Sequence, residues 1–114
     1  MGKALLPDDS PFTTGGTGRL GTLPSKQMME ECEVLLILGS TMPHLEYYPK
    51  SAKGIQIDSD PKRLGLRYPI EIGLTGDVKE TLQALLPKLA TKSDMSFTTC
   101  TTTHERLERN FNKN

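Results

Sequence analysis

The sequence has little that would attract a charged polymer, because it carries no net charge. Its 14 Lys and Arg residues are balanced by 14 Asp and Glu residues over a length of 114. Domains that bind nucleic acid or anionic membranes through charge show a basic excess. We therefore expect no nucleic-acid partner. The length suits one domain, which buries roughly two thirds of the surface of its unfolded chain.

The sequence is also poor in cysteine and in long apolar runs. Its two cysteines, Cys32 and Cys100, lie too far apart to match a metal-binding or redox motif. The longest apolar run, residues 34–38, is far too short to cross a bilayer, and no charged-then-apolar signal segment begins the sequence. We therefore expect a reduced, cytoplasmic protein without a membrane span.

Few residues offer metal or nucleophilic chemistry. His44 and His104 are the two histidines, and neither has acids or cysteines at metal-ligand spacing. We expect both to be surface or packed histidines. Cys32 lies on an apolar helix face, where we expect it to be buried and inert. The sequence predicts no metal site and no catalytic residue.

Three short apolar segments indicate β-strands. In EVLLILGS the uninterrupted run at residues 34–38 is typical of a strand buried on both faces of a parallel sheet. GIQID (residues 54–58) and IEIGLTGD (residues 70–77) are the other two segments. Each run stops at small or acidic residues, so the predicted strand ends fall at residues 39–41, 58–60 and 76–77.

Helix signals alternate with these strands. Asp60 before a proline is typical of an N-cap with proline at the first helical position. Asp77 and Glu80 form a capping-box pattern that starts the helix DVKETLQALLPKLA, and Pro87 predicts a kinked or frayed last turn. A shorter helix, KQMMEECE, opens at residues 24–25. The apolar stripes are Val78, Leu82, Leu85, Leu86 and Leu89 in the longer helix, and Met28, Met29 and Cys32 in the shorter one.

This alternation predicts an open parallel α/β sheet, in which ligands bind beyond the carboxyl ends of the strands. The three strand ends would then lie along one edge. The glycine-rich segment TTGGTGRLGT, residues 13–22, has two interpretations. Its bare backbone amides could approach a phosphate, or the segment could be a flexible turn, and the glycines alone do not decide.

Four segments of the chain resemble a known family in their order and spacing. They are GKALLPDDSPFTTGGTGRLGT, LLILGSTMPHLEYYP, GIQIDSDPKRLGLRYP and GLTGDVKETLQALLP, and the likeness covers residues 2–94. The sequence resembles the central domain of thiamine-diphosphate-dependent enzymes of the pyruvate oxidase, quinone-linked pyruvate dehydrogenase and acetolactate synthase group. The resemblance implies a Rossmann-like α/β domain that carries FAD, an ADP-like ligand or nothing.

The resemblance implies that a dinucleotide, chiefly FAD, binds along three parts of the chain. These are a glycine loop, the loop after the first strand, and acids at the strand ends that accept hydrogen bonds from the adenosine part. The residues implied are Thr17, Gly18, Arg19 and Leu20 in the glycine loop, Ser40, Thr41, Met42, Pro43 and His44 in the second loop, and Asp58 with Asp77 at the strand ends.

The strand-end acids and the tyrosines also have plainer interpretations. We expect Asp60 to be an N-cap, and Asp77 fits an N-cap role at least as well as it fits a ligand role. Of the three acids only Asp58 lacks an obvious capping position, so it is the preferred ligand acid. Tyr47 and Tyr48 could stack on a ring of the ligand, but we expect them to pack a loop on its own core.

The resemblance also sets expectations for the rest of the protein. Residues 1–92 would form a partial central domain, truncated at its N-terminal side, and residues 93–114 a Thr-rich, charged tail that is poorly ordered or a linker helix. Thiamine diphosphate and magnesium would be held by the remaining domains of the parent enzyme, because their motifs are not in this sequence. The family's preceding strand is missing, so the edge at residues 34–38 should be open and favour a homo-oligomer.

These observations support three functional hypotheses. The first is a fragment of the FAD-binding central domain of a flavoenzyme resembling pyruvate oxidase, which alone has no turnover. The second is a non-catalytic module that binds FAD, ADP or NAD. The third is a degenerate domain that serves only structure or oligomerisation.

Overall fold

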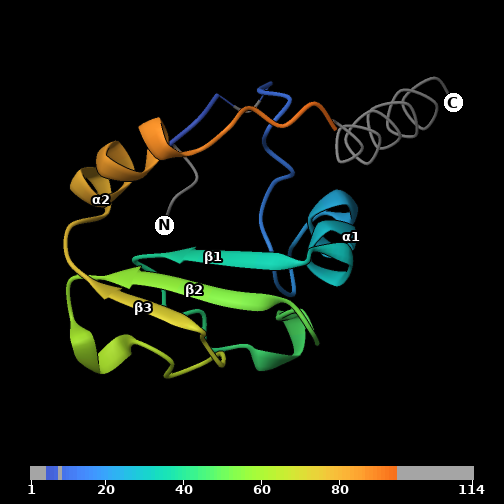
Figure 1. Ribbon diagram of the computed structural model, residues 1–114. Coiled ribbons are helices and arrows are strands. Elements are labelled where there is room, and N and C mark those ends of the chain that lie inside the picture. Colours follow the sequence, from blue (N-terminus) through green and yellow to red (C-terminus); the bar gives the residue numbers. More distant parts are fainter. Residues whose placement is uncertain (1–4, 8, 95–114) are drawn as a thin grey trace, which may run out of the picture. The chain divides into compact units, whose positions relative to one another are not determined.

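The computed structural model describes residues 5–7 and 9–94, which form two compact units (Figure 1). The sheet unit is Cys32–Thr91, and the loop unit holds residues 5–7, 9–31 and 92–94. Cys100 and His104 lie outside the described residues. The predicted domain boundary at residue 92 therefore stays a prediction.

The sheet unit contains three parallel strands, β1 (Val34–Leu38), β2 (Lys53–Asp58) and β3 (Ile72–Thr75), in the order β1-β2-β3. Leu38 pairs with Ile57 across the first ladder, and Ile57 pairs with Leu74 across the second. Parallel neighbours require crossover connections, and each connection here returns the chain to the starting end of the next strand. The predicted Rossmann-like, open parallel α/β arrangement is confirmed.

One face of the sheet is covered by the connection between β2 and β3, which lies below the strands in Figure 1. Gly54 shows how close this connection comes, because a Cβ atom there would lie 2.5 Å from the carbonyl oxygen of Pro69. The hydroxyl of Tyr68 donates a hydrogen bond to the carbonyl of Ala52 at 2.6 Å, and its ring is buried. Glycine at position 54 therefore allows the connection to lie directly on β2.

Helix α2 (Val78–Leu85) lies on the other side of the sheet (Figure 1). Asp77 caps it, since its Oδ1 accepts a hydrogen bond from the Glu80 N–H at 3.0 Å. The α-helix stops at Leu85, and a single 3-10 turn (Leu86–Lys88) follows around Pro87. The predicted cap and the irregular last turn are both confirmed, because each depends on local sequence.

Strand β1 departs from its prediction, because it is not buried on both faces. Val34, Leu36 and Leu38 are 53%, 41% and 37% exposed, whereas Ile37 is buried. The exposed residues alternate with Leu35 and Ile37, so they share one face. The reason is packing, since the described residues leave this face of β1 largely uncovered.

Two tyrosines hold the segments that flank β2. Tyr48 stacks on Tyr68 with ring centroids 5.3 Å apart, and its hydroxyl donates to the carbonyl of Met42 at 3.2 Å. Tyr47 meets the His44 ring edge-on at 6.2 Å. These contacts confirm that the tyrosines pack a loop. Cys32 is only half-buried, and burial raises the pKa of its thiol, which a backbone hydrogen bond partly opposes.

We expect Tyr48→Phe to lower the free energy of unfolding by about 1 kcal/mol, because it removes one hydrogen bond and keeps the stacked ring. Burial raises the pKa of Tyr48 above its ordinary value of 10.0, although Arg67 opposes this. The folded state therefore holds this proton more tightly than the unfolded state. This contribution to stability is complete below pH 10 and disappears as the pH rises through the raised pKa.

Denaturant unfolding at neutral and alkaline pH, followed by circular dichroism, measures both effects. The difference in stability between wild type and Tyr48→Phe should shrink at alkaline pH. A difference that grows with pH would contradict this assignment.

Candidate functional site

The three strand ends lie side by side at the carboxyl edge of the sheet, as predicted. The Gly39 N–H donates to the Ile57 carbonyl at 2.9 Å, and the Gly76 N–H donates to the Asp58 carbonyl, also at 2.9 Å. These bonds continue both ladders past the last strand residues. The strand-end site is therefore the region around Asp58, between the chain that leaves β1 and the chain that leaves β3.

Asp58 has an unusual environment for a carboxylate. Its side chain is 3% exposed, and Oδ1 accepts a hydrogen bond from the Asp60 N–H at 2.9 Å. Its Oδ2 atom is buried and has no hydrogen-bond partner among the described residues. Nearly all buried polar atoms in proteins are paired, and an unpaired one costs about 1–3 kcal/mol. This oxygen is therefore an acceptor that no donor among the described residues satisfies.

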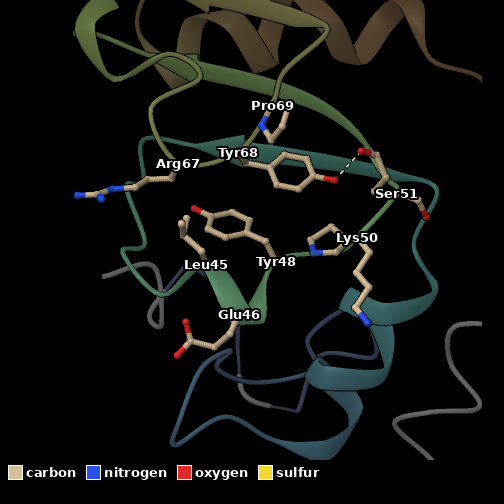
Figure 2. A pocket seen from close by; sticks show the side chains of 10 residues that line it. Leu45, Glu46, Tyr48, Lys50, Ser51, Arg67, Tyr68 and Pro69 are labelled. Atoms are coloured by element: carbon tan, nitrogen blue, oxygen red, sulfur yellow. Dashed lines mark hydrogen bonds between the residues drawn. The ribbon is translucent and has the colours of Figure 1, made fainter.

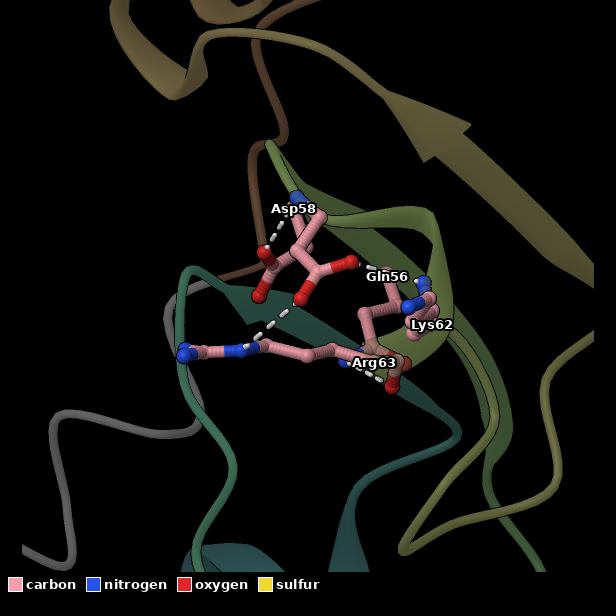
Figure 3. A network of polar contacts seen from close by, with 5 residues as sticks. Gln56, Asp58, Lys62 and Arg63 are labelled. Carbon is pink, nitrogen blue, oxygen red and sulfur yellow. Dashed lines mark hydrogen bonds and ion pairs between the residues drawn. The ribbon is translucent and has the colours of Figure 1, made fainter.

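The turn after Asp58 is a small polar network, shown in Figure 3. Asp60 Oδ1 accepts a hydrogen bond from the Lys62 N–H at 3.0 Å, which caps the 3-10 helix Pro61–Arg63. Asp60 Oδ2 lies 3.7 Å from Nε of Arg63, and both side chains are about half exposed. The predicted N-cap role of Asp60 is confirmed, although the element that it caps is one 3-10 turn.

Gln56 holds this turn against the sheet, and the sequence reasoning missed it. Its side chain is 4% exposed. Nε2 donates to the Arg63 carbonyl at 3.1 Å, and Oε1 accepts from the Gly65 N–H at 2.8 Å. Gln56 and Asp58 are two residues apart on β2 and share a face. A glutamine inside the apolar segment GIQID was the available signal, because a buried amide requires partners.

Asp77 and the loop after β1 have structural contacts of their own. Asp77 is exposed and caps α2, as described above. Met42 accepts the Tyr48 hydroxyl through its carbonyl, which fixes the middle of the loop. The predicted ligand residues of this loop, Ser40, Thr41, Met42, Pro43 and His44, follow β1 along the chain, and the bond to Tyr48 draws Met42 towards the other end of β2. Their contact with a ligand stays a prediction.

The glycine-rich segment belongs to the loop unit and folds back on itself. The Gly21 N–H donates to the Gly18 carbonyl at 2.9 Å, and the Thr22 N–H donates to the Gly16 carbonyl at 3.0 Å. Gly18 has φ +106°, a left-handed conformation that favours glycine. A Cβ on Gly21 would lie 2.7 Å from the Gly16 carbonyl oxygen. The segment is thus a defined turn, not an open linker.

Helix α1 (Leu23–Glu31) fastens this turn. Thr22 begins the helix, since its hydroxyl accepts the Ser25 N–H at 3.3 Å and contacts the Thr14 carbonyl. The predicted opening at Pro24 and Ser25 is therefore one to two residues late. Ser25 is buried, and its hydroxyl donates to the Gly15 carbonyl at 3.2 Å. Of the four predicted loop ligands, Thr17, Gly18, Arg19 and Leu20, all but Gly18 are exposed.

A hollow of about 480 Å³ lies at the other end of β2, near its first residue (Figure 2). Tyr48 and Tyr68 lie at its centre in the figure, and the Arg67 side chain points away from them. Both tyrosine hydroxyls are already bonded to backbone carbonyls. The hollow is remote from Asp58 along the strand and does not belong to the strand-end site.

Within residues 5–7 and 9–94, no helix is long and apolar enough to cross a membrane. The same residues contain no group of three or more His, Cys, Asp and Glu side chains placed to hold a metal ion.

An open parallel α/β sheet with a buried acid at a strand's carboxyl end is an architecture used by nucleotide-binding domains. The sequence pattern of the thiamine pyrophosphate enzyme central domain matches residues 1–85. The chain belongs to this family. The membership supports thiamine diphosphate dependence in the family's enzymes and agrees with the fold.

Several full-length relatives are similar to this chain. A Bacillus subtilis protein named as thiamine pyrophosphate-containing, YdaP, is 38% identical over 90% of this chain and 18% of its own length. A sulfoacetaldehyde acetyltransferase of Roseovarius nubinhibens is 35% identical over 75% of this chain and 15% of its own. A Methanocaldococcus jannaschii protein named as a probable acetolactate synthase large subunit is 34% identical over 78% of this chain and 16% of its own length. The chain spans less than a third of each of these relatives.

Proposed function

We propose that this chain is part of the FAD-binding central domain of a thiamine-diphosphate-dependent flavoenzyme that resembles pyruvate oxidase. In this proposal the whole enzyme decarboxylates a 2-oxo acid oxidatively. When bound, FAD would accept the electrons and pass them to oxygen or a quinone. The observation that carries the proposal is the buried Oδ2 of Asp58 at the carboxyl edge of the sheet, which has no hydrogen-bond partner within residues 5–7 and 9–94.

The chemistry of Asp58 fits the adenosine half of FAD. A ribose hydroxyl donates a hydrogen bond, and a strand-end carboxylate accepts one in other dinucleotide-binding folds. Because Oδ1 is already bonded to the Asp60 N–H, Oδ2 is the atom left for the ligand. Oδ2 has no access to solvent, so binding requires a local rearrangement of the surrounding side chains or loops, as is common in complexes.

The other proposed contacts follow the chemistry of their segments. Gly18 presents its backbone without a side chain, and an added Cβ on Gly16 would meet open space, so this turn can lie close to a pyrophosphate. Arg19 at the exposed tip would add a charge-assisted hydrogen bond. Within the sheet unit, the loop after β1 and Asp77 would contact the dinucleotide together with Asp58.

Thiamine diphosphate, magnesium and the decarboxylation chemistry belong in this proposal to the remaining domains of the parent enzyme. Those domains are the proposed protein partners of the chain. The chain's own residues would bind and orient the dinucleotide, and we assign none of them a catalytic role.

A titration of the purified chain with FAD, followed by flavin fluorescence, tests the proposal. We expect saturable binding, competition by ADP, and affinity roughly ten- to a hundredfold weaker in Asp58→Asn. The reason is that the asparagine keeps an acceptor for the Asp60 N–H but replaces the charged Oδ2, and hydrogen bonds to charged groups contribute about 1.5–3 kcal/mol.

Glu33→Gln is the matched control. Glu33 is exposed and precedes β1, at the opposite end of the sheet, so the same loss of one charge should leave FAD affinity unchanged. Circular dichroism shows whether each variant is folded. Absence of FAD binding by the folded wild-type chain, or equal weakening in both variants, would overturn the proposal.

A second candidate function is a non-catalytic module for ADP or NAD, and the same oxygen favours it. Asp58 would contact the adenosine part, which FAD, ADP and NAD share. FAD binding that is no tighter than ADP binding would support this module. A structural or oligomerisation domain is the third candidate, and the exposed side chains of β1 support it.

A further inference from the structure

The hollow near the first residue of β2 has the features of a second binding site. The residues that line it, 45–46, 48–52 and 67–69, include none of those proposed to hold the dinucleotide. Its volume of about 480 Å³ lies within the usual range of about 300–1,000 Å³ for small-molecule sites. We propose that it binds a small carboxylic acid with a flat apolar ring, whose ring lies against Tyr48 and whose carboxylate meets Arg67.

The wall of the hollow is a stacked pair of aromatic rings. Tyr48 and Tyr68 are inclined by only 18°, with their centroids 5.3 Å apart, and the hydroxyl of each is already bonded to a backbone carbonyl. Tyr68 is buried, whereas Tyr48 is half-buried and so has ring surface left for a ligand. Leu45, which is 56% exposed, adds apolar surface next to it. A flat ring placed on Tyr48 would continue the stack.

The charged residues around the rings favour an anion. The lining contains two cations, Lys50 and Arg67, and one acid, Glu46. Neither cation forms an ion pair with any residue that the structure describes, and Figure 2 shows the three charged side chains pointing in different directions. The Arg67 guanidinium is therefore available to a carboxylate, with which arginine forms paired, charge-assisted hydrogen bonds.

Arg67 is also close enough to act together with the ring of Tyr48. In Figure 2 its side chain lies on the side of the hollow to which the Tyr48 hydroxyl points. Burial raises the pKa of Tyr48, and the positive charge of Arg67 opposes that rise, so the field of the guanidinium reaches this side chain. The exposed Arg67 side chain can turn towards a ligand without movement of the backbone. One molecule can therefore contact both groups.

2-Naphthoate and 2-naphthamide test the proposal, because they share one fluorescent ring system and differ in charge. The chain contains no tryptophan, so the naphthalene ring can be excited alone, beyond the absorption of tyrosine. Fluorescence anisotropy at low salt then measures both affinities. We expect wild type to bind the carboxylate about three- to tenfold more tightly than the amide, and Arg67→Gln to reduce this ratio below about twofold.

Arg63→Gln is the matched control. It removes the same charge from an exposed arginine of the same connection, but Arg63 lies near the carboxyl end of β2 and pairs with Asp60. The ratio of the two affinities should therefore stay at the wild-type value. Acetate, which has the charge without the ring, should displace 2-naphthoate only at a concentration at least about tenfold above that of unlabelled 2-naphthoic acid analogues such as 1-naphthoate.

Each outcome decides one part of the proposal. Equal affinity of wild type for the two ligands overturns recognition of the carboxylate, and an unchanged ratio in folded Arg67→Gln overturns the role of Arg67. Displacement by acetate as readily as by 1-naphthoate overturns the role of the ring. Failure of both naphthalene ligands to bind the folded chain overturns the site. None of these outcomes bears on the FAD proposal, whose residues lie elsewhere.

Discussion

Ile57→Ala is expected to lower the free energy of unfolding of the sheet unit by about 3 kcal/mol. Ile57 is 0% exposed and is the one fully buried side chain in the part of the chain that the structure describes. It lies on the central strand β2, with Leu38 and Leu74 as its partners in register. Removing three carbons there leaves a cavity between all three strands, and small domains have only about 5–15 kcal/mol of stability.

Urea unfolding followed by circular dichroism measures this loss. Ile57→Val is the matched control, because it removes one methyl group and should cost only about 0.5–1.5 kcal/mol. If Ile57→Ala unfolds at the same urea concentration as wild type, the core of this unit does not depend on Ile57. The packing described for β2 would then be wrong.

The second large effect concerns self-association, which we propose occurs through strand β1. Its sequence VLLIL has no charge and no proline to discourage pairing, and β1 is an edge strand among those described. Such edges recruit strands from other chains. We expect wild type to form dimers or larger homo-oligomers at micromolar concentration, and Leu36→Lys to shift the chain strongly towards monomer.

Sedimentation velocity over a range of concentrations measures this association. Leu36 is 41% exposed, so lysine is tolerated there without burying its charge. Leu89→Lys is the matched control, because Leu89 is also exposed, at 59%, but follows helix α2 and is outside the sheet. A monomeric wild type, or the same effect from both lysines, would contradict association through β1.

Features that depend on neighbouring residues were predictable from the sequence. Asp60 and Asp77 cap the elements that follow them because a short carboxylate reaches the N–H groups two or three residues ahead. The irregular turn at Pro87 follows from a missing N–H. The three strand ends share one edge because strands that alternate with helices run parallel, and this could be predicted without knowing any side-chain contact.

Features that depend on distant segments were not predictable in the same way. The exposure of β1 depends on what lies against it, and no local pattern encodes that. The two hydrogen bonds of the Gln56 side chain depend on a turn seven to nine residues later. The stacking of Tyr48 on Tyr68 depends on two different connections. The sequence predicted Asp58 as the preferred acid, but the lack of a partner for its Oδ2 among the described residues depends on which donors the fold brings near it.

In the proposed function, Oδ2 of Asp58 favours ligand binding at a cost to the stability of the ligand-free protein. A buried carboxylate whose second oxygen has no partner in the described part of the chain weakens the ligand-free fold, so an amide or apolar side chain at this position would be selected under pressure for thermostability alone. A laboratory evolution experiment that rewards only heat resistance should therefore erase this aspartate early. Retention of the acid through such selection would mean that the chain gains something from it other than stability.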